Sequence, residues 1–207
     1  MMQATDDLID SLAGHAGDTD ATPASLRRFM LGTLFLAGAA ATLLVWTLFG
    51  FREDFAAMVQ GAPFLFKTSG ALFLAGGAFL LARRAALPAS GPLNALLLIP
   101  GALPFLLFAV LEPEKGEHLS AFWCSADIAL LAVPAFALIL TAMRKGASTS
   151  PARSGAVAGL LAASLATAAH ALACHNDNGV SVLLWYGTAI VTLSGIGALI
   201  GKRALRW

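Results

Sequence analysis

Two cysteines, a histidine and an aspartate in the second half of the chain could do chemistry together. Cys124 and Cys174 are the two cysteines among 207 residues. Asp127 follows Cys124 by three residues and His170 precedes Cys174 by four, so each lies one helical turn from its cysteine if both stretches are helical. His175 directly follows Cys174 and is a further candidate ligand or supporting group. The spacing predicts that Cys124, Asp127, His170 and Cys174 converge, with His175 nearby at the rim.

Such a set supports several chemistries, and the sequence leaves them open. It could be a reversible disulfide flanked by an Asp–His pair. Two thiolates with an imidazole also suit zinc, copper(I) or cadmium. A static disulfide would close a loop of about fifty residues and stabilise the fold by roughly 4 kcal/mol, and two unrelated thiols are the remaining alternative. A thioredoxin-like relay is poorly supported, because the chain has no C-x-x-C.

The composition indicates which elements must position these residues. Apolar residues make up 58% of the chain and charged residues 12%, against about 25% charged in soluble domains, and the mean hydropathy is +0.77. This excludes a disordered chain, a basic nucleic-acid-binding domain and an ordinary soluble enzyme. The pattern predicts an all-α bundle of six transmembrane helices, each about 20 residues long. The six stretches are about 29–51, 63–82, 93–111, 122–143, 155–173 and 180–201.

The basic residues predict the direction of the spans. Ten of the thirteen lysines and arginines flank alternate ends of the six stretches, which by the positive-inside rule puts both termini in the cytoplasm. These anchors are Arg27, Arg28, Arg83, Arg84, Arg144, Lys145, Arg153, Lys202, Arg203 and Arg206. Lys67 lies one turn inside the second stretch, where we expect it to snorkel outward. The loops are too short for a soluble catalytic domain, so we expect no enzyme.

The same topology compares the depths of the two cysteines. Cys124 lies twenty residues from Arg144, and Cys174 lies twenty-one from Arg153. At about 1.5 Å per residue, both reach roughly 30 Å from the inner basic edge. The fourth and fifth stretches are consecutive, so packing side by side would bring the sulfurs to one level on the outer side of the membrane, where disulfides are permitted.

The segment before the first stretch is a separate region. We divide the chain into a cytoplasmic tail, residues 1–28, and a membrane domain, residues 29–207. The tail favours a short amphipathic helix with three aspartates and three aliphatic side chains: Asp6, Asp7, Leu8, Ile9, Asp10 and Leu12. An isolated helix this short is marginal in water. It is therefore either a solvated acidic tail or a segment that folds on a partner with a basic surface.

Several short motifs together resemble one family. They are Thr5–Ala13, the step from Pro23 to Arg27, Gly50–Asp54, Pro134 with Met143-Arg144, the two cysteines, and above all the closing runs Leu184–Thr188 and Gly197–Trp207. Over nearly its whole length the chain is similar to the NrsF-type negative regulators of sigma-F, which are six-span inner-membrane anti-sigma factors of bacteria.

The resemblance implies a function. Members of this family hold an extracytoplasmic-function sigma factor at the membrane and release it under heavy-metal or oxidative stress sensed by two outer-side cysteines. Carried over, the sensors are Cys124 and Cys174, and the sigma-binding segment lies within residues 1–28. The partners are then a sigma factor and the lipid bilayer, with no direct nucleic-acid contact. No cofactor is implied, except a heavy-metal ion at the cysteines.

Two other classes remain as alternatives. A small multi-pass transporter or metal-handling membrane protein would need a conducting path and would be indifferent to deletion of residues 1–22. A membrane oxidoreductase would transfer electrons to a quinone, and the absence of a second cysteine pair counts against it.

Overall fold

The computed structural model describes residues 23–50, 52–86, 94–112, 122–146, 148 and 150–205. All secondary structure in this part of the chain is helical. The expected amphipathic helix of the tail, with its six named residues, lies outside the described residues, as does the anchor Arg206.

Residues in the first turns explain where several of the helices begin. Pro63 and Pro151 stand in the first turns of two of them, where a missing N–H costs nothing. The Asn178 side chain accepts a hydrogen bond of 3.1 Å from the Ser181 N–H and so caps the last helix. The elements are α2 (Pro23–Leu48), α3 (Phe55–Met58), α4 (Ala62–Ala85), a 3-10 turn η1 (Ala95–Leu98), α5 (Ile99–Leu111), α6 (Phe122–Met143), α7 (Pro151–His170) and α8 (Gly179–Ala204).

Five of the six expected spans are confirmed as helices long and apolar enough to cross a bilayer: α2, α4, α6, α7 and α8. The third stretch differs from the expectation. It forms the shorter apolar helix Ala95–Leu111, whose first turn is 3-10 and whose middle contains Pro104. The short helix α3 lies in the loop between the first and second spans.

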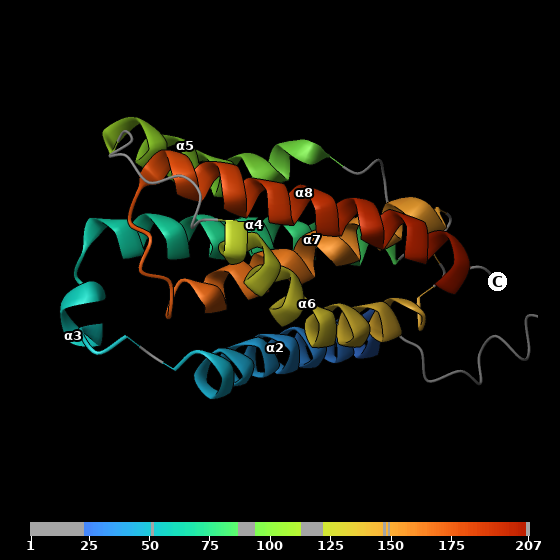
Figure 1. Cartoon of the computed structure of the whole chain (residues 1–207). Helices are drawn as coiled ribbons and strands as arrows, with labels where there is room; N and C mark the ends of the chain where they lie inside the picture. The colour runs from blue at the N-terminus through green and yellow to red at the C-terminus, as the bar shows by residue number, and fades with distance from the viewer. Residues whose placement is uncertain are drawn as a thin grey trace, which may run out of the picture.

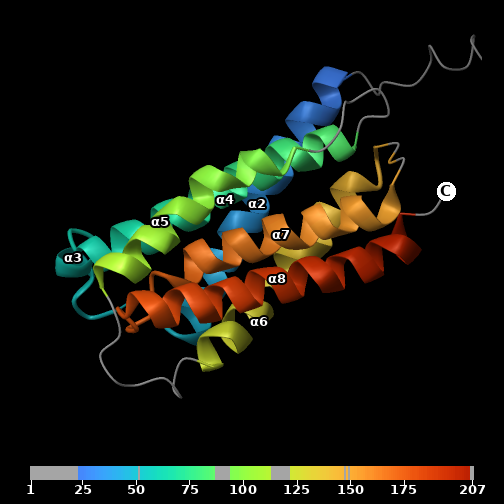
Figure 2. The same cartoon turned by 90° about the horizontal axis from the view of Figure 1, so that it is seen from above.

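Helix α7 lies at the centre of the bundle. It contacts α2, α4, α6 and α8, whereas α5 lies at the edge against α4 and α8 (Figures 1 and 2). The buried fraction of the long spans agrees with the central place of α7, since 72% of its window is buried against 22–50% of the windows of α2, α4, α6 and α8. The central helix α7 is also the span richest in alanine, glycine and serine, which lets four neighbouring helices pack against it.

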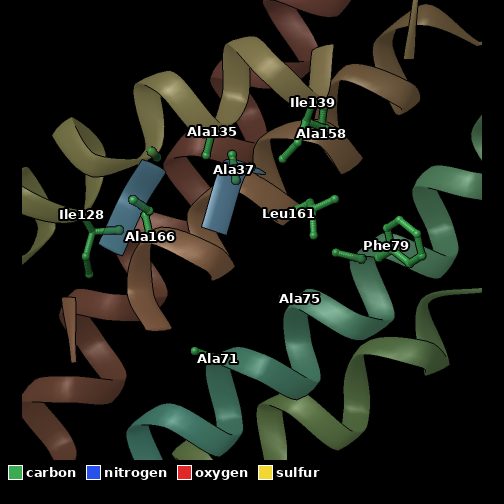
Figure 3. Close-up of a cluster of buried hydrophobic side chains, with 14 of the residues drawn as sticks. Ala37, Ala71, Ala75, Phe79, Ile128, Ala135, Ile139, Ala158, Leu161 and Ala166 are labelled. Carbon is green, nitrogen blue, oxygen red and sulfur yellow. The ribbon is translucent and has the colours of Figure 1, made fainter. Parts of the chain in front are cut away.

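The core is built mainly from alanine and a few larger aliphatic side chains. Figure 3 shows Ala71, Ala75 and Phe79 of α4 facing the region where Leu161 of α7 and Ile139 of α6 lie. Small residues let membrane helices approach closely, which matters where lipid removes the hydrophobic drive for association. Large apolar side chains remain on the outside, including Phe35 (80% exposed), Val110 (76%) and Val191 (72%). Such a surface suits lipid rather than water.

Gly155 and Gly159 in α7 and Gly197 and Gly201 in α8 form a close helix crossing. A Cβ added to Gly201 of α8 would lie 2.6 Å from the Cα of Gly155 in α7, and one added to Gly197 would lie 3.1 Å from the Cα of Gly159. Ordinary carbon contacts are about 3.5–4.0 Å. These four positions therefore require glycine for the backbones to meet.

The two ends of the bundle differ in charge. The starts of α2 and α7 and the ends of α4, α6 and α8 lie together at the end nearest the C-terminus (Figures 1 and 2). We call this the basic end, and its residues are Arg27, Arg28, Arg83, Arg84, Arg144, Lys145, Arg153, Lys202 and Arg203. The opposite end carries α3 and both cysteines, and we call it the cysteine end.

Candidate functional site

Three of the candidate residues meet at the cysteine end. The Sγ atoms of Cys124 and Cys174 are 3.8 Å apart, and both residues are free thiols. The ligand atoms of Cys124, His170 and Cys174 all lie within 4.8 Å of one another. His170 and Cys174 are buried, at 4% and 5% exposure, and Cys124 is half-buried. We call these three residues the cysteine cluster.

Local helix geometry explains why His170 accompanies Cys174. Helix α7 ends at His170, but the Cys174 N–H still donates to the His170 carbonyl at 3.0 Å. The helical i to i+4 relation therefore continues one turn beyond the helix and places both side chains on one face. Cys174 thus lies just beyond the end of α7, with its sulfur beside Cys124 at the start of α6.

The structure does not bring Asp127 or His175 into the cysteine cluster. The face of α6 that packs inward follows the i+4 step from Cys124 to Ile128, which is fully buried, and Asp127 lies beside that face and is half-buried. His175 is exposed one residue beyond Cys174. The group whose ligand atoms lie within 4.8 Å of one another contains neither Asp127 nor His175.

The surroundings of His170 are aromatic and leave its ring nitrogens unpaired. The ring of Phe49 stands edge-on at 6.2 Å between centroids, and the ring of Tyr186 at 5.9 Å. Among the described residues, neither nitrogen of His170 has a hydrogen-bond partner, nor has the hydroxyl of Tyr186, and all three atoms are buried. A buried polar group without a partner is costly. The imidazole is therefore poised to bind a further atom.

The donor set and its spacing fit a thiophilic ion. Two thiolates about 2.3 Å from one tetrahedral zinc ion lie about 3.8 Å apart, the separation of the two sulfurs here. Two unbonded sulfurs in contact also lie at this distance. A disulfide needs about 2.05 Å, so the same pair becomes covalent if the sulfurs approach by about 1.8 Å. The cluster can therefore hold a soft metal or form a disulfide.

The expectation that Lys67 snorkels outward is wrong. Instead of snorkelling outward it is 1% exposed, and its ammonium donates to the Asp177 carboxylate at 2.8 Å and to the Asn176 carbonyl at 3.0 Å. A lysine charge at this depth is costly unless it is paired. The nearest anion lies in the loop after α7, so pairing inside the protein replaces the route to water.

Arg52 binds the same loop as Lys67 does. Its guanidinium donates to the Cys174 carbonyl at 3.3 Å and to the Asp177 carboxylate at 3.4 Å. A two-pronged bond to Asp54, at 2.7 and 2.8 Å, fixes the plane of the guanidinium. That hydrogen bond raises the pKa of Arg52 and lowers the pKa of Asp54 below its usual range. The loop that carries Cys174 is thus held by two cations.

Tyr186, Arg52 and the ion pair of Lys67 belong to the site but were not predicted from the sequence. A tyrosine inside an apolar span needs a partner for its hydroxyl, and this is the signal that Tyr186 carries in the sequence. The signal for the ion pairs was present, because Asp177, Lys67 and Arg52 all fall on the same predicted side of the bundle. Nothing in the spacing paired them, since over a hundred residues separate the partners.

Comparison with known proteins decides the family. Residues 15–207 match the family described as "Negative regulator of sigma F". The chain belongs to this family. It is 32% identical over 216 residues to the "Anti-sigma-F factor NrsF" of Caulobacter vibrioides and 30% identical over 213 residues to the "Probable anti-sigma-F factor NrsF" of Azospira oryzae. Each alignment covers 98% of this chain and 99% of the relative. No solved structure matches the chain.

The family that the sequence motifs indicated is therefore confirmed. The chain is a negative regulator of a sigma factor and has a sigma factor as its partner. Its long apolar helices mark it as a membrane protein.

Proposed function

We propose that the chain is an inner-membrane anti-sigma factor that binds an extracytoplasmic-function sigma factor through its cytoplasmic tail and releases it when the cysteine cluster reacts. The observation that carries the sensing half is the meeting of Cys124, Cys174 and His170 within 4.8 Å. The basic end lies at the other end of the bundle. By the positive-inside rule the cysteine cluster then faces the outside and the tail faces the cytoplasm.

The shorter helix Ala95–Leu111 bears on this topology. Between the end of α4 and the start of α6 the chain must cross once more, because the ends of α4 and α6 carry basic anchors on the same side. A 3-10 turn followed by thirteen α-helical residues spans about 27 Å. That length is close to the hydrocarbon thickness. We propose that this helix is the sixth span.

The two signals act on one pair of sulfurs. Oxidation joins Cys124 and Cys174 in a disulfide, and a thiophilic ion such as cadmium or zinc binds both thiolates and the His170 imidazole. Either event fixes α6 to the segment that follows α7. A signal must favour one of two bundle states by several kcal/mol to move most molecules. Metal–thiolate bonds and disulfides are strong enough for that.

The tail supplies the other half of the proposal. Its aspartates complement the basic DNA-binding surface of a sigma factor, and Leu8, Ile9 and Leu12 supply an apolar face. The regulator would then compete with promoter DNA and core polymerase without contacting nucleic acid.

The test is release of the sigma factor from a complex purified in detergent. Diamide or cadmium chloride should release sigma from wild type, and C124S or C174S should keep sigma bound under both treatments. H175Q is the matched control, because His175 is exposed beside Cys174 and lies outside the cluster. Normal release from both serine variants would refute the proposed sensor.

A further inference from the structure

Lys67 is the most deeply buried charge in the described part of the chain, and both of its bonds go to one loop. It lies in the second turn of α4 and is 1% exposed. Its partners, the Asn176 carbonyl and the Asp177 carboxylate, are 109 and 110 residues away. A buried ammonium must be paired. The position of the loop after α7 is therefore tied to α4 by a charge that has no other partner among the described residues.

Arg52 binds the same loop as Lys67, and one of its bonds goes to Cys174. It shares Asp177 with Lys67 and also donates to the carbonyl of Cys174 itself. Three points of the loop are held as a result: the backbone at residue 174, the backbone at residue 176 and the side chain at residue 177. Only Asn178, which caps α8, follows before the next helix.

This arrangement limits where the Cys174 sulfur can go. The sulfur lies 3.8 Å from that of Cys124, and it belongs to a residue beyond the end of α7 whose backbone carbonyl is bound by Arg52. Without the two cations the hydrogen bonds that remain are the helical turn onto His170, the bond from the Asn178 N–H to the Asn176 side chain, the cap at α8 and the bond from the Gly179 N–H to the Glu112 carbonyl. None of these bonds binds the backbone carbonyl of Cys174 or the side chain of Asp177. The sulfur would then sample positions away from Cys124.

We propose that Lys67, acting with Arg52 through Asp177, is a positioning residue of the cysteine cluster: it keeps the Cys174 thiol against Cys124 and so sets how readily the pair closes. The inference deepens the proposed function, since it concerns regulation of the same site. Arg52 also links the Cys174 loop to the end of α2. Arg52 follows α2 by only a few residues, so a displacement of the Cys174 carbonyl acts on the end of the helix that leads to the tail.

The test is the thiol–disulfide equilibrium of the purified full-length protein in detergent, without sigma. Glutathione disulfide is the oxidant. Cys124 and Cys174 each lose a hydrogen, the two sulfurs join, and the glutathione S–S bond breaks to give two glutathione thiols that carry both protons. The fraction oxidised is read at fixed glutathione ratios by maleimide labelling of the remaining thiols on a gel.

We expect K67M to lower the equilibrium constant for closure about tenfold, which is about 30 mV for this two-electron couple. K67R keeps the cation and should recover at least half of the loss on a logarithmic scale. K202M makes the same change at an exposed lysine of the basic end and should match wild type. A constant for K67M equal to or above that of wild type overturns the proposal.

Asp177→Asn covers the case in which K67M does not fold. Asp177 is a half-exposed loop residue, and its side chain is 42% exposed. The variant removes the carboxylate that both cations bind and should lower the constant in the same direction. An unchanged constant for D177N also overturns the proposal. Failure of the proposed function would look different, because sigma would stay bound to wild type after its cysteines had demonstrably closed.

Discussion

The crossing of α7 and α8 predicts that a single methyl group at Gly201 loosens the bundle. A Cβ there would lie 2.6 Å from the Cα of Gly155 and 2.6 Å from the carbonyl oxygen of Pro151. Carbon atoms in contact lie about 3.5–4.0 Å apart, so the helices must separate by roughly 1 Å. Both neighbours are backbone, which cannot rotate away as a side chain can.

Overpacking of this kind costs about 1–3 kcal/mol. Alanine in place of glycine also favours the helix by up to about 1 kcal/mol, and a matched substitution cancels that gain. Gly195 lies on the same helix with nothing within 4 Å of its added Cβ. At roughly 2–4 °C per kcal/mol for a chain of this size, G201A should melt about 4–8 °C below G195A for a cost near 2 kcal/mol.

The assay is thermal unfolding of both variants in one detergent, followed by circular dichroism. Because α7 carries His170 and leads to Cys174, the same separation should also reduce disulfide closure in G201A. Equal melting temperatures for G201A and G195A would refute the close crossing of α7 and α8 at this point.

Three further predictions concern single side chains. H170F should weaken binding of cadmium to the reduced protein at least tenfold, measured by thiolate absorbance, while H175F should not, because only His170 belongs to the cysteine cluster; equal affinities would remove His170 from the site. Y186F should leave the melting temperature unchanged or raise it, since the buried Tyr186 hydroxyl has no partner among the described residues; a fall of several degrees would reveal a hydrogen bond there. Arg52 lowers the pKa of Asp54 in the folded protein. The stability that this carboxylate contributes is therefore complete above the ordinary pKa of about 3.9 and is lost as the pH falls through the lower folded value. D54N should show a smaller loss of melting temperature than wild type between pH 5 and pH 2, and an identical loss would show that the pair does not contribute.

The sequence predicted the helices well because their signal is strong and local. Long apolar runs bounded by basic residues have few alternative structures in a membrane protein, and α6 has the predicted limits of Phe122 and Met143. The third stretch was harder, because Pro100 and Pro104 interrupt its helical pattern and a 3-10 turn replaces its first residues. Its length alone could not show this.

The site was predictable only where residues share a helix face. The i to i+4 spacing of His170 and Cys174 indicated that they lie together, and equal depth on neighbouring spans suggested a meeting with Cys124. The choice between Asp127 and Ile128 as the inward residue depended on the rotation of α6, which packing against α7 sets. The pairing of Lys67 with Asp177 joins segments 110 residues apart, and no periodicity in the sequence encodes such a contact.

The most direct test of the proposed function is co-purification of a co-expressed extracytoplasmic-function sigma factor with this protein in detergent, with and without residues 1–22. We predict that sigma is retained by the full chain and lost when the tail is removed, while the truncated bundle still forms its Cys124–Cys174 disulfide under oxidation. Retention of sigma by the truncated protein, or its absence from a folded full-length protein, would contradict the proposed mode of binding.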